Sequence, residues 1–505
     1  MHTLVDPLKR ALQICPNEVA VIDGDVEVTY EELWARCSRL VGALQNLGAV
    51  NGDRIAILSN NSHQYFEAYM GIPAGGMVVV PLNTRHALPE LMYALEDSGA
   101  KILLTDREDI GGLQGIVDHV IALNADYEDV LAAATPAPLG VDASEEDLAG
   151  LFYTGGTTGA SKGVMLTHRN LIANAFNWLS AVPQGPNDRS LVMAPMFHAA
   201  GSNGILAAIW QGSCQVALGA FEPKTVLQLI EKHKINITLG VPSMLAAIAE
   251  EQHANPKDVS SLKILAHGGS PIATEVIKRS SKAFPSAQMI EVYGATETSP
   301  LATLLGNEEQ LIDDPKARSC GRSVVGCAIT ICAPEGRALP TGEVGEVVVS
   351  GANIMKGYWN KVEQTAAVIK EGGYWTGDLG YLDAEGYLFL VDRSKDMIVS
   401  GGENVYSTEV EDVLYKFPGV LEAAVFGVPD EKWGEAVYAV VVPRPEATDV
   451  TPEALIAFCR EHIGGYKVPK GIDIQFEPLP KSGPGKVLKR ELRAPFWAAT
   501  DRSVN

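Results

Sequence analysis

The chain has 505 residues, of which 46% are hydrophobic, and its 62 acidic and 40 basic residues give a net charge of −22. This negative balance disfavours nucleic acid and anionic membranes as the main partners, because both require clustered basic side chains. The sequence contains no apolar run of about 18 residues or more, and its start lacks a basic segment followed by an apolar one. We therefore expect a soluble intracellular protein of about two to four domains, placed in the cytoplasm and without an integral membrane segment.

Seven cysteines are scattered along the chain without a C-x-x-C pair. An odd number at irregular spacing favours free, buried thiols over disulfides or zinc ligands. Such cysteine usage is typical of a reducing compartment.

Strand-like and helical patterns alternate from about residue 20 to residue 143. The apolar periodicity predicts strands over 53–59, 77–80 and 101–105, and helices over 64–70 and 89–98. This β-α-β rhythm indicates an open α/β sheet with helices on its faces. In such folds, ligands bind at the carboxyl ends of the strands.

A glycine-rich segment follows the strand-like residues 148–152. It holds four glycines and three threonines, in the order Thr154, Gly155, Gly156, Thr157, Thr158, Gly159, Ala160, Ser161, Lys162 and Gly163. Backbone N–H groups, hydroxyls and the lysine charge can converge on an anion, so the segment predicts a phosphate-binding loop. It is not a Walker A loop, because Ser161 and Gly163 stand where that motif needs a glycine and a hydroxyl residue. A flexible linker is the alternative.

The alternation continues beyond this loop, and the chain then changes character twice. Strands are predicted over 190–194, 237–241, 262–266 and 288–293, and helices over 204–210 and 225–233. Short segments with turn residues predict a β-rich subdomain at about 321–394. Helices over 408–416 and 452–462, with strands over 421–426, 436–442 and 472–476, predict a separate α+β lobe. We expect an N-terminal domain over 1–394 and a C-terminal domain over 395–505.

The segment from Tyr293 to Glu297 directly follows a predicted strand. The Tyr293 ring can stack on a base, the Thr296 hydroxyl can bind phosphate, and the Glu297 carboxylate can hold Mg²⁺. A helix start with Thr296 as its N-cap is the alternative.

Two further motifs lie toward the end of the chain. Asp378, between Gly377 and Gly380, can accept hydrogen bonds from a vicinal diol such as ribose, although an ordinary turn would also explain it. Lys486 lies in a Gly/Pro-rich segment, and its ammonium group can approach and stabilise an oxygen on which negative charge develops. A solvated basic tail is the alternative for this segment.

Together and in this order, the four motifs resemble those of the adenylate-forming enzymes, which include acyl- and aryl-CoA synthetases, luciferase and peptide-synthetase adenylation domains. The resemblance extends from about residue 16 to residue 493 and is greatest to the acid–CoA ligases. It implies ATP, Mg²⁺ and coenzyme A as cofactors. It also implies that a small mobile C-terminal domain rotates between acyl-AMP formation, with pyrophosphate release, and thioester formation.

The resemblance implies a role for each motif residue. For the nucleotide, it implies that the ATP phosphates are bound by Thr154, Gly155, Gly156, Thr157, Thr158, Gly159 and Lys162, and the adenine by Gly268, Gly269, Ser270, Tyr293 and Gly294. It further implies that Thr296 binds the α-phosphate, Glu297 binds Mg²⁺, Asp378 binds the ribose and Arg393 makes a further nucleotide contact. In the C-terminal part, Lys395 would be the hinge, Gly401 and Gly402 would accommodate pantetheine, and Lys486 would be the lysine of the adenylation step. The family commonly has serine and proline where this chain has Gly155 and Ser161, which implies slightly looser phosphate binding.

The segment around His198 indicates which class of acid the protein binds. Adenylating domains for amino acids carry an aspartate at this position, so an amino acid is disfavoured, and in CoA ligases His198 resembles a gate residue. A purely structural histidine is the alternative. Small residues predict space for an apolar tail or ring, namely Ala199, Gly201, Gly240 and Ala295. We expect an apolar monocarboxylate, either a fatty acid or an aryl acid such as a hydroxycinnamate.

Three other activities remain open. An acyl-AMP ligase would load a carrier protein, a luciferase-like oxygenase would oxidise the adenylate, and a non-catalytic protein would only bind nucleotide. Lys486 and Glu297 disfavour the last of these. We expect a monomer or a homodimer whose partners are the acid, ATP and CoA.

Overall fold

In the computed structural model, the described residues are 2–140, 143–154, 161–202, 204–270, 272–370, 373–393, 396–400, 403–430, 432–447, 449–481 and 487–497. The chain forms two compact units. Unit 1 comprises Met1–Ile329, Val348–Tyr374 and Gly386–Leu388, and unit 2 comprises Thr330–Val347, Trp375–Glu385 and Phe389–Asn505.

The described part of unit 1 contains two large sheets. The first has nine strands in the order β15 (Arg322–Ser323), β14 (Thr303–Gly306), β13 (Gln288–Tyr293), β12 (Ile264–Gly268), β11 (Ile237–Gly240), β9 (Arg189–Val192), β10 (Cys214–Ala217), β1 (Val19–Asp23) and β2 (Val26–Thr29). The second has seven strands in the order β18 (Gly357–Tyr358), β8 (Lys162–Thr167), β7 (Leu148–Thr154), β4 (Val78–Pro81), β3 (Arg54–Leu58), β5 (Ile102–Thr105) and β6 (His119–Ala122). Central neighbours pair in parallel, as in β11–β12 and β3–β4.

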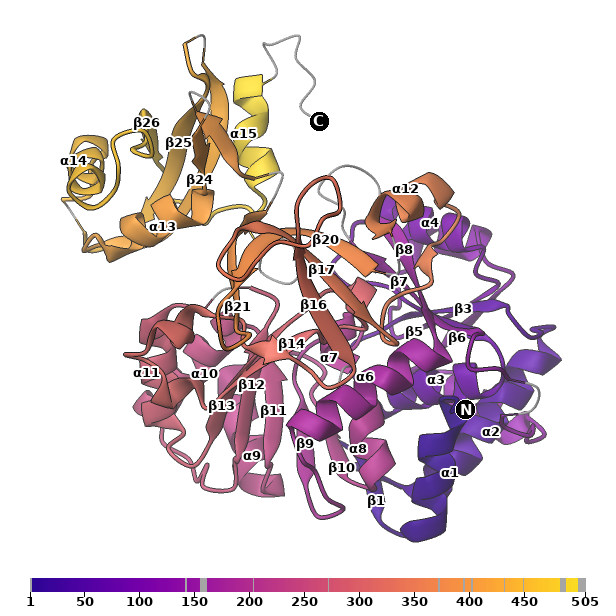
Figure 1. Cartoon of the computed structure of the whole chain (residues 1–505). Helices are drawn as coiled ribbons and strands as arrows, with labels where there is room; N and C mark the ends of the chain where they lie inside the picture. Colours follow the sequence, from indigo (N-terminus) through magenta and orange to yellow (C-terminus); the bar gives the residue numbers. More distant parts are fainter. Residues whose placement is uncertain are drawn as a thin grey trace. The chain divides into compact units, whose positions relative to one another are not determined.

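Successive side chains along each strand pack into different hydrophobic cores. Unit 1 therefore consists of layers. In β3, Ile55 faces the core that the two sheets share, whereas Ala56 faces an outer core with α4 (Leu88–Ser98). In β9, Val192 faces the shared core, whereas Leu191 faces an outer core with α9 (Pro223–His233), α10 (Pro242–Ala254) and α11 (Thr274–Ala283). Helices therefore cover the outer faces and fill the space between the sheets (Figure 1).

The helices of these layers have the following bounds. Between the sheets lie α1 (Val5–Ile14), α2 (Tyr30–Asn46), α3 (His63–Ala74), α6 (His168–Ala181) and α8 (Ile205–Gln211). The outer helices are α4 (Leu88–Ser98), α9 (Pro223–His233), α10 (Pro242–Ala254) and α11 (Thr274–Ala283). The shorter α5 (Tyr127–Ala133), α7 (Ala199–Ser202) and α12 (Val362–Val368) complete the set described in this unit.

The β-rich region forms a further sheet. Its order is β16 (Cys327–Cys332), β17 (Gly345–Gly351), β20 (Gly373–Leu382) and β19 (Ile369–Lys370), with β21 (Leu388–Arg393) beside β20. The strands β16, β17 and β20 each carry residues of both units.

Unit 2 also contains an α+β lobe. Its sheet has the order β23 (Glu403–Val405), β22 (Ile398–Ser400), β25 (Gly434–Pro443) and β24 (Val420–Asp430), with β26 (Gly471–Ile474) beside β25. The helices described in this lobe are α13 (Ser407–Lys416), α14 (Pro452–His462) and α15 (Lys489–Trp497). The predicted α/β class, the β-rich region and the smaller C-terminal α+β part are confirmed.

Local sequence accounts for several helix starts. The Thr29 side chain accepts a hydrogen bond from the Glu32 backbone, and Glu32 reaches back to Thr29, which forms a capping box at α2. Thr451 caps α14 in a similar way and is followed by Pro452, whose fixed φ suits a first helical residue.

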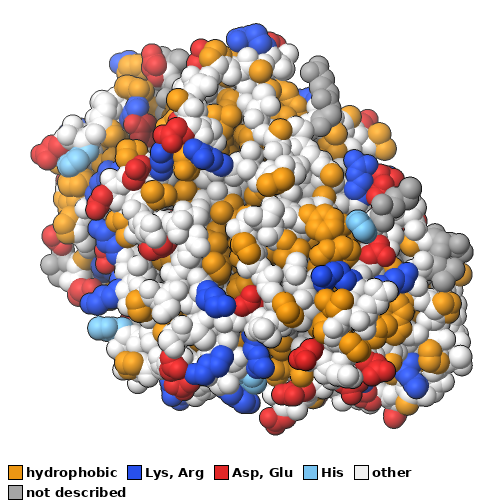
Figure 2. Space-filling model, turned by 60° about the horizontal axis from the view of Figure 1, so that its bottom comes forward, with side chains coloured by type: hydrophobic (Ala, Val, Ile, Leu, Met, Phe, Trp, Pro, Cys, Tyr) orange, Lys and Arg blue, Asp and Glu red, His pale blue; other side chains and the backbone are white. Residues whose placement is uncertain are grey.

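The structure agrees with the expectations from composition. The cysteines are free thiols, as predicted. Among the described residues, no helix combines the length and the apolar character that a membrane crossing requires. On the face shown in Figure 2, acidic and basic side chains are interspersed with hydrophobic and neutral ones.

Candidate active site

The carboxyl ends of β11, β12 and β13 lie at one edge of the nine-stranded sheet, because these neighbouring strands are parallel. They end at Gly240, Gly268 and Tyr293. The fold therefore brings predicted residues for the adenine, the α-phosphate and the acid to this edge: Gly240, Gly268, Gly269, Ser270, Tyr293, Gly294, Ala295, Thr296 and Glu297.

Several predicted site glycines are required by close packing. A Cβ at Gly294 would lie 1.8 Å from the Pro300 carbonyl oxygen, and one at Gly268 would lie 2.4 Å from the Val292 carbonyl oxygen. At Gly240, a Cβ would lie 2.6 Å from the Met193 methyl group. Gly268 and Gly294 therefore let backbone segments approach each other at the sheet edge, whereas the neighbour of Gly240 is the end of a flexible side chain.

A single 3₁₀ turn, η2 (Thr296–Thr298), follows β13 and presents Thr296 and Glu297. The backbone N–H of Ala295 donates to Thr298 Oγ1 at 3.0 Å, and that hydroxyl donates to the Ala295 carbonyl at 2.9 Å. The alternative of Thr296 as an N-cap is therefore wrong, since Ala295 is the capping residue and Thr298 closes the turn.

Glu297 and Lys162 share Tyr358 as a neighbour, although they are far apart in sequence. Tyr358 Oη donates to Glu297 Oε1 at 2.8 Å, and Lys162 Nζ lies 4.7 Å from the centroid of the Tyr358 ring. Burial, and then the Glu297 charge, raises the pKa of Tyr358 well above its usual value, which keeps the hydroxyl protonated as a donor. Tyr358 was not predicted, because no local sequence pattern marks a tyrosine that acts through a distant carboxylate.

The surroundings of Glu297 suit Mg²⁺ that is bound with a nucleotide. Among the described residues, no group of three or more His, Cys, Asp or Glu side chains could hold a metal ion. Mg²⁺ is commonly bound through one or two carboxylates, water and substrate phosphates rather than by a protein cage. One carboxylate near the lysine predicted to bind phosphate fits this mode.

The predicted phosphate loop connects two paired strands. Thr154 at the end of β7 pairs with Lys162 at the start of β8 in an antiparallel register. Thr154 and Lys162 are thus held opposite each other. The loop residues Gly155, Gly156, Thr157, Thr158 and Gly159 lie outside the described residues.

A buried acidic group underlies the predicted adenine segment. His267 Nε2 and Glu308 Oε2 are 2.6 Å apart, and both side chains are fully buried. Burial raises the pKa of nearby Glu291 to about 7, with a further contribution from the Glu308 charge that opposes the effect of His267. This buried contact joins His267 of β12 to Glu308 and was not predicted from the sequence.

His198 lies beside Phe197, with ring centroids 4.5 Å apart. Burial, and then the positive charges of Arg85 and His86, lower the pKa of His198 to about 4. The imidazole is therefore neutral at physiological pH. Ala199 begins the short helix α7 that follows His198.

In unit 2, Asp378 and Arg393 form an ion pair. Arg393 Nε and Asp378 Oδ1 are 3.3 Å apart. Asp378 lies inside β20, directly after Gly377, which has a φ of +74°. The alternative of an ordinary turn at Asp378 is therefore wrong, and the two residues predicted to contact the nucleotide are neighbours.

The described lysines on either side of Lys486 are paired with acidic side chains. Lys481 and Val487 form an antiparallel bridge, and Lys481 pairs with Glu422. Farther along, Lys489 Nζ lies 2.8 Å from Glu411 Oε1. The alternative of a freely solvated basic tail is thus wrong for the described lysines. Lys486 itself, the hinge residue Lys395, and Gly401 and Gly402 lie outside the described residues.

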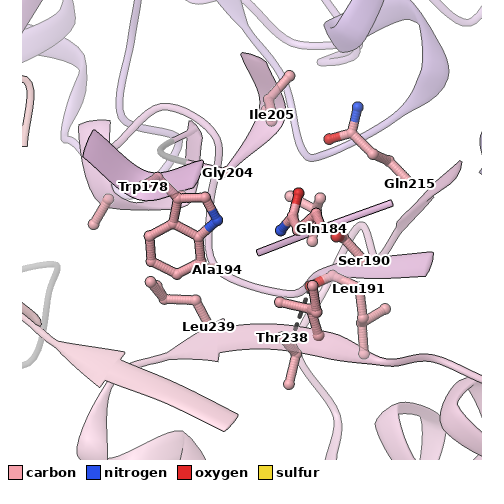
Figure 3. Close-up of a pocket in the computed structure, with 14 residues that line it drawn as sticks. Trp178, Gln184, Ser190, Leu191, Ala194, Gly204, Ile205, Gln215, Thr238 and Leu239 are labelled. Carbon is pink, nitrogen blue, oxygen red and sulfur yellow. Dashed lines mark hydrogen bonds between the residues drawn. The ribbon is translucent and has the colours of Figure 1, made fainter. Parts of the chain in front are cut away.

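Unit 1 contains a cavity beside β9 and β11. Its volume is about 40 Å³. Trp178 of α6, Ser190 of β9, Gln215 of β10 and Ile205 of α8 surround it (Figure 3). Its lining includes the exposed Ala200, whereas Trp178 and Gln215 are buried, so it leads from the surface into the space between the sheet and the helices.

The cavity adjoins only part of the predicted acid pocket. Gly201 lines it, whereas His198, Ala199, Gly240 and Ala295 lie outside its described lining. Leu239, the neighbour of Gly240, belongs to the lining. The cavity therefore starts next to these residues and extends along β9 and β11 away from them.

Comparison with known proteins gives matches along almost the whole chain. The family model for AMP-binding enzymes matches residues 8–359, and the model for the AMP-binding enzyme C-terminal domain matches residues 409–486. A feruloyl-CoA synthase of Amycolatopsis is 38% identical over 493 residues, which cover 97% of this chain and 98% of that protein. A long-chain-fatty-acid–CoA ligase of Mycobacterium tuberculosis is 33% identical over 506 residues, which cover 98% and 99% of the two chains.

Solved structures agree with these matches. The o-succinylbenzoate CoA synthetase of Bacillus subtilis, in complex with its acyl-adenylate intermediate, superposes with a TM-score of 0.87 at 31% identity and 99% coverage of both chains. The same enzyme in complex with ATP and a magnesium ion gives a TM-score of 0.85 at 30% identity, and the match covers 97% of this chain and 99% of that one.

Proposed function

The chain belongs to the AMP-binding enzyme family, and we propose that the acid it joins to coenzyme A is a compact aryl acid of the hydroxycinnamate type. The predicted membership of the adenylate-forming superfamily is confirmed, as are the acid–CoA ligase activity and the use of ATP, Mg²⁺ and CoA. The choice of acid, the roles of individual residues and the domain movement are our proposals.

The reaction has two half-reactions. A carboxylate oxygen of the acid attacks the α-phosphorus of ATP, and pyrophosphate leaves. The thiol of CoA then attacks the acyl carbon, and AMP leaves with one oxygen of the original carboxylate. The protein mainly positions these reactants and neutralises charge.

Each step has proposed residues in this chain. The segment from Thr154 to Lys162 holds the leaving pyrophosphate, and Thr296 holds the α-phosphate. Glu297 is the Mg²⁺ carboxylate and is positioned by Tyr358, which donates to it at 2.8 Å. Mg²⁺, when bound, neutralises phosphate charge.

Residues of unit 2 complete the proposed reaction. Asp378, paired with Arg393, binds the ribose hydroxyls. Lys486 stabilises the negative charge that develops in adenylation. A domain over 395–505 then rotates about Lys395, after which Gly401 and Gly402 accommodate pantetheine. We place the enzyme in the cytoplasm as a monomer or homodimer.

The proposed class of acid is inferred from the size and position of the cavity. The cavity runs from Ala194, two residues after the end of β9, to Ser190 within β9, a span of at most about 13 Å at roughly 3.3 Å per residue. The cavity is small, and its lining includes the buried Trp178 and Gln215. The length of the cavity, rather than its volume of about 40 Å³, favours an aromatic ring on a short arm over an extended long-chain acyl group.

A direct screen tests this proposal. The purified protein is given ATP, Mg²⁺ and CoA with hydroxycinnamic, benzoic, short-chain and long-chain fatty acids, and CoA-dependent AMP release is measured. We expect kcat/KM for a hydroxycinnamic acid to exceed that for any fatty acid by about tenfold or more. A preference for fatty acids would overturn the proposed substrate class.

The same assay separates the other activities. Turnover with a phosphopantetheinylated carrier protein but not with CoA would indicate an acyl-AMP ligase. Light emission with a luciferin in the absence of CoA would indicate a luciferase-like oxygenase.

A further inference from the structure

The deep part of the cavity in Figure 3 carries buried polar atoms that lack partners. These atoms are Trp178 Nε1, Gln184 Oε1, Ser190 Oγ, Gln215 Oε1 and Gln215 Nε2, none of which has a hydrogen-bond partner within the described structure. Trp178 and Gln215 are only 2% and 1% exposed. Unpaired polar groups at such depth are costly and need a ligand or water to satisfy them.

The fold directs these groups toward one space. Ser190 of β9 and Gln215 of β10 are register partners on adjacent parallel strands, so their side chains point to the same face of the sheet. That face packs against Trp178 of α6, whose indole nitrogen lies on the side of the ring that faces the Gln184 amide (Figure 3). By contrast, Thr238 Oγ1 already donates to the Leu191 carbonyl at 2.9 Å.

The chemistry of these atoms selects the group that they bind. The Trp178 indole only donates, whereas the Gln215 amide and the Ser190 hydroxyl both donate and accept. The described lining contains no charged side chain, so a second carboxylate would be left without a counter-ion. A neutral hydroxyl both donates and accepts hydrogen bonds, so it can pair with these polar atoms, whereas an alkyl tail would leave them without partners.

We propose that Trp178, Ser190, Gln184 and Gln215 form a subsite that binds a phenolic hydroxyl on the ring of the substrate, at the end remote from its carboxylate. This inference rests on the proposed function, because it assumes that the ring of an aryl acid enters the cavity. The subsite makes the enzyme specific for hydroxylated aryl acids among those of similar size.

Ordered water is the other occupant that these atoms would suit. A subsite that holds only water predicts no dependence on a hydroxyl of the substrate. A subsite built for a hydroxyl discriminates strongly against an analogue that lacks it, because the buried polar groups then remain unpaired.

The test compares 4-hydroxycinnamic, 4-methoxycinnamic and unsubstituted cinnamic acid. For the wild-type protein, we expect kcat/KM for the 4-hydroxy acid to exceed that for each analogue by a factor on the order of ten or more. Equilibrium binding of the three acids, measured by calorimetry, should follow the same order.

Two variants locate the effect. Gln215→Leu and Ser190→Ala should each reduce the preference for the 4-hydroxy acid over cinnamic acid severalfold, and Ser190→Ala keeps the test open if Gln215→Leu does not fold. Ser180→Ala is the matched control. Its hydroxyl donates to the Asn177 carbonyl within α6 at 2.9 Å and lies outside the described lining, so this variant should keep the wild-type preference.

The outcomes separate the two proposals. Equal use of all three cinnamic acids, or a preference that survives in both variants, would overturn the hydroxyl subsite and leave the aryl acid proposal standing. Turnover of fatty acids in preference to every aryl acid would overturn the proposed function itself. A preference that falls in both variants but not in Ser180→Ala would support the subsite.

Discussion

The hydroxyl of Tyr358 donates to Glu297, while its ring faces Lys162. Tyr358→Phe removes the donor and keeps the ring, so it isolates the positioning of the carboxylate. We expect the Mg²⁺ concentration for half-maximal adenylation to rise by about tenfold or more, because a hydrogen bond to a charged group contributes about 1.5–3 kcal/mol. The measurement is acid-dependent ATP–pyrophosphate exchange over a series of Mg²⁺ concentrations.

Glu297→Gln is the reference for this experiment and should raise the Mg²⁺ requirement further. An unchanged requirement in both variants would remove Glu297 from the metal site. A change in Glu297→Gln alone would show that Tyr358 has no positioning role.

Glu291 should make the stability of the protein depend on pH. In the folded state its pKa is raised to about 7, against an ordinary value of 4.5, mainly by burial. The folded state therefore retains this proton while the unfolded chain releases it, and the free energy of unfolding falls as the pH rises from about 4.5 to 7. The loss is on the order of 3 kcal/mol.

Glu291→Gln removes this titration. The variant should have a higher Tm than the wild type at pH 8, and the difference should shrink at pH 5. The Tm of both proteins at the two pH values provides the check. An equal pH dependence in the two proteins would contradict the assignment.

Single residues differ in how far the sequence predicts them. Asp378 and Arg393 were predicted separately as nucleotide contacts, and the fold makes them neighbours. Tyr358 and Glu308 were not predicted, because their partners Glu297 and His267 are distant in sequence and no local spacing encodes the contact. Ser190 and Gln215 were not predicted either, because their proposed role depends on the pairing of strands that are distant in sequence.

At the scale of elements, the turn after β13 depends on Gly294. A Cβ there would lie 1.8 Å from the Pro300 carbonyl oxygen, so one of the two backbone segments must shift in Gly294→Ala. We expect the Tm to fall by about 5 °C and ATP binding to weaken, because Thr296 and Glu297 follow directly. Differential scanning calorimetry and nucleotide titration measure the two effects.

Gly112→Ala provides the control for this variant. A Cβ at Gly112 meets no heavy atom within 4 Å, so the substitution should leave the Tm almost unchanged. If Gly294→Ala behaved like Gly112→Ala, the proposed packing of this turn would be wrong.

Element positions were largely predictable, whereas strand pairing was not. The predicted strand over 288–293 matches β13, and the predicted helix over 452–462 matches α14, because apolar periodicity is a local property. The predicted helix over 64–70 continues to Ala74 in α3, with Pro73 inside its last turn. Open α/β sheets were predicted for the N-terminal domain, but the assignment of strands to each sheet was not, since strands of similar composition occur in both.

At the scale of the whole molecule, the proposed domain movement separates the two half-reactions. Lys395→Pro restricts the backbone at the proposed hinge and should retain pyrophosphate release while thioester formation falls by about tenfold or more. Lys486→Ala should do the reverse and abolish most adenylation. Single-turnover assays of acyl-AMP and acyl-CoA measure each step.

Lys470→Ala, which removes an exposed lysine of unit 2, is the control and should leave both steps unaffected. If Lys486→Ala kept full adenylation and lost only thioester formation, the proposed roles would be reversed. If Lys395→Pro slowed both steps equally, the hinge would be misplaced.

Composition changes along the chain predicted a β-rich region and a later α+β lobe. The shift toward turn-rich segments after residue 321 corresponds to β16–β21, and the later lobe corresponds to β22–β26 with α13–α15. Composition could not predict that β16, β17 and β20 each carry residues of both compact units, because contact density is not a local property of the sequence.

The central claim is that an aryl acid is joined to CoA through an acyl-adenylate. The most direct test supplies 4-hydroxycinnamic acid labelled with ¹⁸O in its carboxylate, together with ATP, Mg²⁺ and CoA, and determines the mass of the AMP formed. The account predicts AMP that carries one ¹⁸O atom and a thioester that retains the other. Unlabelled AMP, or label in the pyrophosphate, would contradict it.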